Sequence, residues 1–192
     1  MVRRIGLVAL ALGVVVASGA AQGMRVPASK DKAPEFVGGP WLNTKDGKPL
    51  TLASRKGKPT LVAFWTFDCI NCRHNLAAYE RLLAKYRPLG VELLSVHTPE
   101  LPEEHDAKLL QQHIEKFKIS YPVLVDNSET NWNRWHLSVW PSLYVVDANG
   151  MVRYHWFGEL NWDNAGGEEK VAKILDGLLA EGSVGAAVSG SH

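Results

Sequence analysis

The sequence predicts an α/β domain in which helices cover a central mixed β-sheet. Strand-like apolar runs alternate with segments of helical periodicity, two of these runs are apolar enough to predict buried strands, and a hairpin pattern precedes the last helix. The chain has 192 residues, of which 46% are hydrophobic and 21% charged, and its net charge is +1. This balance excludes an intrinsically disordered chain and predicts no nucleic-acid partner. Two cysteines are too few for a disulfide-stapled mini-scaffold or a four-cysteine zinc site.

Residues 1–23 have the three-part pattern of a signal peptide. Arg3 and Arg4 supply the positive start, residues 5–17 are apolar, and small residues then offer a cleavage site. Because a helix that crosses a bilayer needs roughly 20 apolar residues, we expect a cleaved signal peptide, with an uncleaved membrane anchor as the alternative. In both cases the domain is exported, to the periplasm or another extracytoplasmic space. Its cysteines then meet an oxidising compartment.

Composition sets the expected limits of the domain. Residues 24–39 are expected to form a linker, since proline and glycine punctuate a polar stretch. Residues 182–192 are rich in glycine, serine and alanine, which predicts a flexible tail. The folded domain is therefore expected at residues 40–181.

The elements of this domain follow from periodicity and from turn residues. Turn residues between two short apolar runs predict a β-hairpin at the start of the domain. Apolar positions spaced four and three apart predict helices, and Pro88 with Gly90 ends the first of them. Pro122 cannot donate a ladder hydrogen bond, so its strand is expected at a sheet edge. The expected order is a hairpin at 41–52, a strand at 58–65, a helix at 72–86, a strand at 91–96, a helix at 105–117, an edge strand at 121–125, strands at 143–146 and 152–157, and a helix at 168–179.

Both cysteines lie in the motif Cys69-Ile70-Asn71-Cys72, where the first buried strand meets its helix. Two scattered cysteines would have this spacing in roughly one chain in a hundred, so the motif is specific. The spacing brings the sulfurs together across one helical turn, which predicts a redox-active disulfide. The helix N-terminus stabilises a thiolate on Cys69, and Cys72, on the buried face, is the expected resolving thiol.

Two other uses of the cysteines are open. A static disulfide would be a poor staple, because closing so short a loop removes little entropy from the unfolded chain. Zinc would have Cys69, Cys72 and His74 as ligands but no second pair at the usual spacing, so no metal site is expected. Two thiols and an imidazole also suit copper. An exported copper metallochaperone that uses Cys69 and Cys72 is therefore an alternative.

The segment Phe-Trp-Thr-Phe-Asp-Cys-Ile-Asn-Cys at 64–72 resembles the active-site segment of the thioredoxin superfamily. More narrowly, it is similar to TlpA-like exported thiol-disulfide oxidoreductases and, most of all, to the thioredoxin-like domain of DipZ-type proteins. The resemblance covers about residues 41–159. Further stretches match in order: Val-His-Thr-Pro-Glu at 96–100, Tyr-Pro-Val at 121–123 with Asp-Asn at 126–127, Trp-Pro at 140–141, and Phe-Gly-Glu at 157–159.

The resemblance implies a thioredoxin fold and assigns roles to individual residues. Trp65 is expected beside the active-site turn, where it lines a substrate groove with Trp140 and Pro141. Pro141 is expected to follow a cis peptide bond, an ordinary trans proline being the alternative. Glu100, in the loop after the second buried strand, is expected to be partly buried near Cys72 and to take its proton. A solvated loop acid beside Glu103 and Glu104 is the alternative for Glu100.

The resemblance also implies dithiol–disulfide exchange with protein disulfides. The cysteine pair carries the electrons, so no cofactor is expected. We expect a reductase, although Ile70-Asn71 does not set the direction. The implied partners are oxidised exported proteins, apocytochrome c among the candidates, and a membrane electron-donor protein of the DsbD/CcdA type. A redoxin-type thiol peroxidase is a further alternative, since Thr66 stands three residues before Cys69, but Val62 stands where that family has proline.

Overall fold

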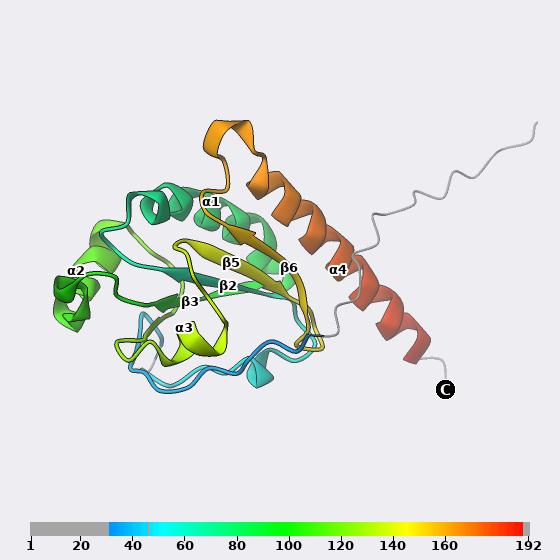
Figure 1. The fold of residues 1–192 in the computed structure, drawn as a ribbon. Helices are drawn as coiled ribbons and strands as arrows, with labels where there is room; N and C mark the ends of the chain where they lie inside the picture. The colour runs from blue at the N-terminus through cyan, green and yellow to red at the C-terminus, as the bar shows by residue number, and fades with distance from the viewer. Residues whose placement is uncertain (1–30, 46, 190–192) are drawn as a thin grey trace, which may run out of the picture.

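The computed structural model describes residues 31–45 and 47–189 (Figure 1). The signal peptide expected at residues 1–23 lies outside these residues. Within the described part of the chain, no helix has the length and apolar character that a bilayer crossing requires.

Six strands form one mixed sheet in the order β1-β4-β3-β2-β5-β6 (Figure 1). β2, β3 and β4 run parallel, β5 runs antiparallel to β2, and the outer strands β1 and β6 run antiparallel to their neighbours. The mixed α/β architecture expected from the sequence is confirmed. The strands are β1 (Trp41–Leu42), β2 (Thr60–Trp65), β3 (Glu92–His97), β4 (Val123–Val125), β5 (Ser142–Val146) and β6 (Val152–Phe157).

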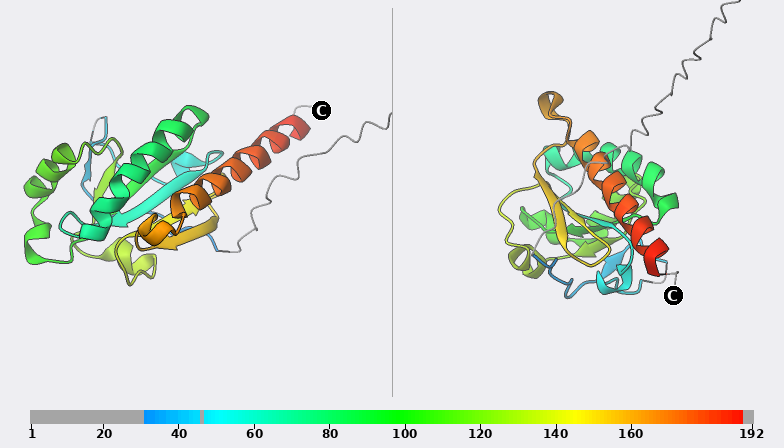
Figure 2. Two further views of the ribbon diagram at one scale, coloured as in Figure 1. Left: turned by 90° about the horizontal axis from the view of Figure 1, so that it is seen from above. Right: turned by 90° about the vertical axis from the view of Figure 1, so that its right-hand side faces the viewer.

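Central strand β2 explains the two layers of the core. Leu61, Ala63 and Trp65 pack on one face, with the helices α1, α2 and α4. Val62 and Phe64 point to the other face, where they meet α3 and the N-terminal segment. The strand is thus buried on both sides, as its continuous apolar run predicts. Figure 2 shows α1 and α4 side by side over the same face. The helices are α1 (Ile70–Tyr86), α2 (Ala107–Lys116), α3 (Thr130–Arg134) and α4 (Gly167–Ser189).

Helix α1 ends where the sequence predicts and begins two residues earlier, at Ile70. Cys69 is its N-cap residue, with extended backbone angles. A 3-10 turn at Arg87–Leu89 follows the helix, and Gly90 then adopts the left-handed conformation with φ 90°. Glycine adopts this conformation without the steric cost that a Cβ would add. The chain therefore turns at once into β3.

The hairpin expected at 41–52 is wrong. β1 pairs with β4, and residues 50–52 form no strand. The Glu35 carboxylate accepts the main-chain N–H groups of Leu52 (2.7 Å) and Ala53 (3.0 Å), and that of Phe36 at 3.0 Å. These bonds hold the stretch against the N-terminal segment instead of against β1.

The described part of the expected linker, residues 31–39, belongs to the domain. Ala33 and Phe36 are buried, and Lys32 forms an antiparallel bridge with Met151 next to β6. Asn131 on α3 accepts the N–H of Val37 and donates to its carbonyl. The expectation of a linker is therefore wrong here, because these apolar side chains cover the α3 face of the sheet.

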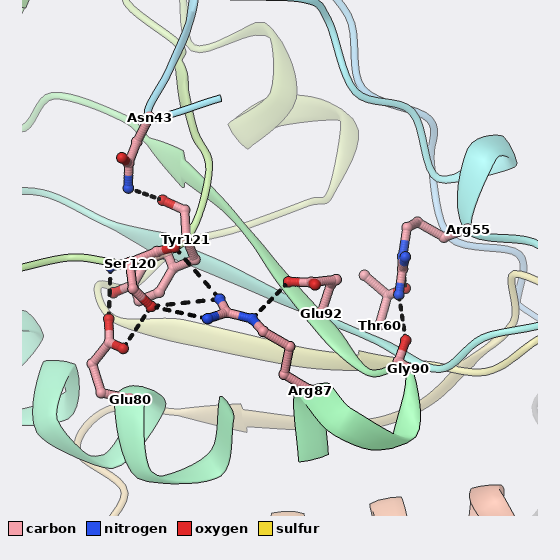
Figure 3. Close-up of polar contacts among 9 residues, drawn as sticks. All are labelled: Asn43, Arg55, Thr60, Glu80, Arg87, Gly90, Glu92, Ser120 and Tyr121. Atoms are coloured by element: carbon pink, nitrogen blue, oxygen red, sulfur yellow. Dashed lines mark hydrogen bonds and ion pairs between the residues drawn. The ribbon is translucent and has the colours of Figure 1, made fainter. Parts of the chain in front are cut away.

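β4 is not the edge strand that Pro122 suggested. β1 lies beyond it, with Trp41 opposite Leu124. The Asn43 amide donates to the carbonyls of Ile119 and Tyr121 and so ties β1 to the chain that enters β4 (Figure 3). Because the strand itself starts after Pro122, the missing N–H costs no ladder bond.

The segment before β4 is also hydrogen-bonded to α1, at the end of the sheet shown in Figure 3. The Glu80 carboxylate accepts the N–H of Ser120 at 2.8 Å and its hydroxyl at 2.7 Å. Arg87 reaches the same serine and pairs with Glu92 at the start of β3. These polar contacts fix the end of the sheet at which β2 and β3 begin.

Two helices differ from the sequence-based expectation. α3 was not expected, because five residues are too few to show a helical period. α4 continues to Ser189, so the flexible tail expected from residue 182 is wrong as far as the helix extends. Val171, Leu175 and Leu178 anchor the start of α4 in the core. Once a helix is nucleated in this way, adding further residues costs little.

We predict that Glu35→Ala destabilises the domain, because three main-chain donors lose their charged acceptor. The loss should be about 1–3 kcal/mol, the cost of leaving hydrogen-bonding groups unpaired. Urea unfolding of the full chain, followed by tryptophan fluorescence, measures it. Glu115→Gln, on the exposed side of α2, is the control and should leave the midpoint unchanged. A Glu35→Ala midpoint equal to that of the control would contradict the role of this carboxylate.

Candidate active site

The two cysteines lie at the carboxyl end of β2, where the chain enters α1. Cys69 is half-buried and Cys72 is buried, and both are free thiols. The main-chain N–H of Cys72 donates to Cys69 Sγ at 3.2 Å. The free amides of the first helical turn thus point at the sulfur of the residue that caps the helix.

The two sulfurs are electrostatically unequal. The pKa of Cys69 is lowered to about 7, mainly by a hydrogen bond from the Cys72 thiol and further by the amides of Cys72 and Asn71, against burial and the charge of Glu100. The pKa of Cys72 is raised, first by burial and then by the neighbouring Cys69. A thiolate therefore forms on Cys69 near neutral pH, while Cys72 keeps its proton.

The Trp140–Pro141 peptide bond is cis, as the resemblance implies. Ser142 lies opposite Phe64 in the sheet, so Pro141 lies beside the end of β2 from which the dithiol turn departs. The Trp140 ring stacks on Trp132 with centroids 3.9 Å apart, and its indole N–H donates to the Thr98 carbonyl at 3.1 Å. This half-exposed indole is held in one orientation at the site.

Trp65 does not line an open groove as expected. Its side chain is 1% exposed, packs in the core beside α1 and donates to Ser95 Oγ at 3.3 Å. The last residue of β2 faces the helix layer, and this alternation buries the ring. Trp65 therefore supports the active-site turn from below. Pro141 is buried as well, so of the three expected groove residues only Trp140 has a partly exposed side chain.

Glu100 is exposed, so the expectation of a partly buried carboxylate at this position is wrong. It nevertheless lies close enough for its charge to raise the pKa of both cysteines. The structure thus brings Glu100 to the dithiol but leaves its side chain in water.

The buried acid of the site is Glu104, for which the sequence predicted no role beyond that of a neighbour of Glu100. It is 1% exposed, and one carboxylate oxygen accepts the N–H of Asp68 at 3.0 Å. The other accepts the N–H groups of Glu100 (2.7 Å) and Leu101 (2.8 Å). A signal for this was present: proline at the first position of a helical turn and glutamate at the third are typical of a helix start. The turn is the 3-10 helix Pro102–His105.

A buried polar chain continues from Glu104 to β3. The Thr66 hydroxyl donates to the Glu104 carboxylate, and His97 Nε2 lies 3.2 Å from the same hydroxyl. Burial lowers the pKa of His97 to about 4, so the imidazole is neutral near pH 7.

His74 turns away from the cysteines to the loop after β6. Its Nδ1 lies 3.0 Å from a carboxylate oxygen of Glu159. Asn75, buried next to it, donates to the Gly158 carbonyl and accepts the N–H of Leu160, which fixes this loop against α1. Within the described ranges, no group of three or more His, Cys, Asp or Glu could hold a metal ion.

Comparisons with known proteins agree with this geometry. A model of the AhpC/TSA family matches residues 29–155. Over 119 residues the chain is 36% identical to Protein DipZ from Mycobacterium tuberculosis, an alignment that covers 62% of this chain and 17% of the relative. It is 26% identical to the thiol-disulfide oxidoreductase ResA from Geobacillus thermodenitrificans over 121 residues, which cover 63% of this chain and 64% of ResA.

Two solved structures show the same fold. One is a putative thiol:disulfide interchange protein DsbE from Chlorobium tepidum, with a TM-score of 0.64 and 22% identity over 77% of this chain and 96% of the other. The second is a thioredoxin-like superfamily protein, with a TM-score of 0.69 and 25% identity over 78% and 96% of the two chains. The thioredoxin fold and the likeness to DipZ-type and TlpA-like proteins are thereby confirmed. The chain spans less than a fifth of the DipZ protein that it matches. A dithiol at the start of α1, a cis-proline beside it and a family match over most of the described domain together place the chain in the AhpC/TSA family, as a member with a thioredoxin-like fold.

Proposed function

We propose that the chain is an exported thiol-disulfide oxidoreductase that reduces protein disulfides through Cys69 and Cys72. The observation that carries this proposal is the inequality of the two sulfurs. The pKa of Cys69 is lowered to about 7, whereas burial raises that of Cys72. An exchange enzyme needs one thiol that attacks and a second that waits, protonated, until the mixed disulfide has formed.

The exchange proceeds in two balanced steps. The Cys69 thiolate attacks one sulfur of a substrate disulfide, so that a Cys69–substrate disulfide forms and the second substrate sulfur leaves as a thiolate. Cys72 then loses its proton and attacks Cys69 Sγ, which releases the first substrate sulfur. The substrate gains two electrons, and the enzyme keeps a Cys69–Cys72 disulfide. The two substrate thiolates take up the proton that Cys72 releases and the one that Cys69 gave to solvent when its thiolate formed.

Glu100 is our candidate acceptor for the Cys72 proton. Its charge reaches both thiols, and its exposed side chain can pass the proton to water. Glu100 lies near both thiols, and its role as proton acceptor is part of our proposal.

The surface around the dithiol supports a protein substrate. A cavity of about 410 Å³ lies between Asn71 of the motif and Phe157 and Trp162 of the β6–α4 region. In our proposal the partly exposed Trp140 forms the opposite side, where a bound chain would pass the backbone at the buried cis-proline Pro141. Among the described residues six large apolar side chains are exposed, and five of them belong to the motif or to the loops around it: Ile70, Leu101, Val139, Phe157 and Trp162.

Export and partners are proposed from the sequence and its relatives. The signal-peptide pattern at residues 1–23 supports an extracytoplasmic location. There, the Cys69–Cys72 disulfide must be reduced again after each cycle, so we propose a membrane electron-donor protein of the DsbD/CcdA type as its donor. Oxidised exported proteins, apocytochrome c among them, would be the substrates. The cysteine pair serves as the only electron carrier that this cycle requires.

The alternatives have less support. A copper metallochaperone that uses the two thiols would gain no help from His74, the imidazole near them in sequence, because His74 pairs with Glu159. A thiol peroxidase would use the Thr66 hydroxyl at the sulfur, but that hydroxyl belongs to the Glu104–His97 chain.

The decisive experiment combines activity with trapping. The full chain should reduce insulin disulfides with dithiothreitol as the reductant, and its reduction potential should be more negative than that of glutathione. Cys72→Ser should accumulate mixed disulfides through Cys69, and Cys69→Ser should accumulate none. Activity that survives in Cys69→Ser would refute the proposal. A reduction potential well above that of glutathione would assign an oxidase. If hydrogen peroxide is the only substrate that the protein reduces, the protein would be assigned as a peroxidase.

We predict a pH-dependent reactivity that separates the cysteines. The alkylation rate of Cys69 should rise with pH and reach half its plateau at about pH 7, because only the thiolate reacts. In Cys72→Ala the midpoint should move upward, since the hydrogen bond from the Cys72 thiol is the largest cause of the lowered pKa. Mass spectrometry of iodoacetamide adducts measures both. A midpoint that is the same in the two proteins would contradict this cause.

We predict that Glu100→Gln slows the resolution of the mixed disulfide. A positioned general base typically contributes 10²–10⁴-fold, and for an exposed one we expect about tenfold. The same change should lower the pKa of Cys69, because a nearby negative charge is removed. Stopped-flow fluorescence of a Cys69-linked model peptide measures the rate. Glu103→Gln, an exposed neighbour, is the control, and equal rates in the two variants would remove Glu100 from the mechanism.

A further inference from the structure

Glu104 is a buried ionisable group of the site that the disulfide exchange does not use. Glu104 is 1% exposed, although Glu103 beside it lies in solvent. Burying a carboxylate is costly unless it is hydrogen-bonded. Burial by itself would raise the pKa of Glu104, but hydrogen bonds from Thr66 and from the amides of Asp68, Glu100 and Leu101 lower it. The group therefore stays ionised over the range in which Cys69 titrates.

The donors to Glu104 come from both sides of the dithiol. Asp68 immediately precedes Cys69, and its N–H reaches one oxygen at 3.0 Å. Glu100 and Leu101 belong to the loop after β3, and their N–H groups reach the other oxygen at 2.7 and 2.8 Å. One carboxylate thus joins the turn that carries the nucleophile to the loop that carries our candidate base.

The turn needs this support because its geometry aims the helix at the sulfur. Cys69 caps α1 with φ −69° and ψ 113°, and the amides of Asn71 and Cys72 then point at Cys69 Sγ. Thr66, which donates its hydroxyl to Glu104, directs its main-chain N–H toward the Cys72 sulfur. Glu104 therefore holds both backbone segments that set the environment of the two thiols.

We propose that Glu104 is a positioning residue of the dithiol, whose carboxylate locks the Thr66–Cys69 turn to the Glu100 loop and so keeps the first amides of α1 aimed at Cys69 Sγ. It touches neither substrate nor the reacting sulfurs. The proposal deepens the proposed function, on which its activity readout depends.

In a Glu104 variant, loss of positioning and loss of the negative charge would shift the pKa of Cys69 in opposite directions, which makes the proposal testable. A negative charge near a thiol raises its pKa, so removing the charge alone would lower the pKa. Loss of the lock would instead let the turn relax, weaken the amide hydrogen bonds to Sγ and raise the pKa toward the value of a free cysteine. A purely structural role would lower stability and leave the Cys69 titration where it is.

The experiment compares Glu104→Gln and Glu104→Asp in the full chain, with Glu103→Gln as the matched control. Glutamine keeps the shape and removes the charge, whereas aspartate keeps the charge and shortens the reach. We expect both to move the alkylation midpoint of Cys69 upward by about one pH unit, which is about a tenfold loss of reactivity below the midpoint. The control should titrate like the wild type, and near-ultraviolet circular dichroism should show that the variants are folded.

An unchanged or lowered midpoint in the two Glu104 variants would overturn the proposal. Should both variants unfold, Thr66→Val decides, since it removes a single donor, and its midpoint should rise by a smaller amount. An unmoved midpoint in Thr66→Val would then overturn the proposal.

Two readouts separate this proposal from the proposed function. The Cys69 midpoint and the hydrogen exchange of the Asp68 amide, which should quicken in Glu104→Gln, do not need a substrate. If the wild type reduces no disulfide but both readouts move as expected, the function fails and the positioning role stands. If the wild type is active and neither readout moves, the positioning role fails by itself.

Discussion

The hydrogen bonds from the first turn of α1 to Cys69 Sγ are the contact on which the rest of the site depends. Every helix leaves its first amides unpaired, and here their partner is the sulfur of the residue that caps the helix. Cys69 is only half-buried, so its thiolate meets solvent and a substrate, while the hydrogen bond from the Cys72 thiol and, after it, the amides lower its pKa. Cys72 lies one turn further into the core, where burial disfavours its charged form and raises its pKa. A single helix start thus produces two different thiols.

Holding that helix start requires polar groups inside the protein. Glu104 accepts a hydrogen bond from the amide of Asp68, just before Cys69, and Asn75 holds the loop after β6 against α1. Trp140 is fixed by stacking on Trp132 and by its bond to the loop after β3. Each clamp joins segments that are far apart in the sequence, and each satisfies its own hydrogen-bonding groups, which makes burial tolerable. The rigid frame of the site is therefore built from tertiary contacts around a local motif.

Sequence patterns were reliable where the local period and the tertiary environment agree. The apolar face of α1, the two-sided burial of β2 and the cis-proline follow from spacing or from family resemblance. Patterns were misleading where residues far away in the sequence determine how a segment pairs. The stretch at 50–52 has strand-like residues, but Glu35 supplies the partners for its amides. Pro122 suggested an edge, but β1 pairs beyond it.

By itself the sequence determined the nature of the chemistry: two cysteines with two residues between them at a strand–helix junction, in a chain whose alternating strands and helices predict a mixed sheet. These features are local, so spacing and composition reveal them. Only the tertiary structure decided which acid is buried. Glu100 and Glu104 lie four residues apart in one loop. The proline and glutamate at 102 and 104 mark a helix start, but this local pattern does not show that Glu104 is buried and Glu100 exposed. Glu104 is enclosed because the folded chain brings the amide of Asp68 to it, and a charge can be buried only where such donors converge.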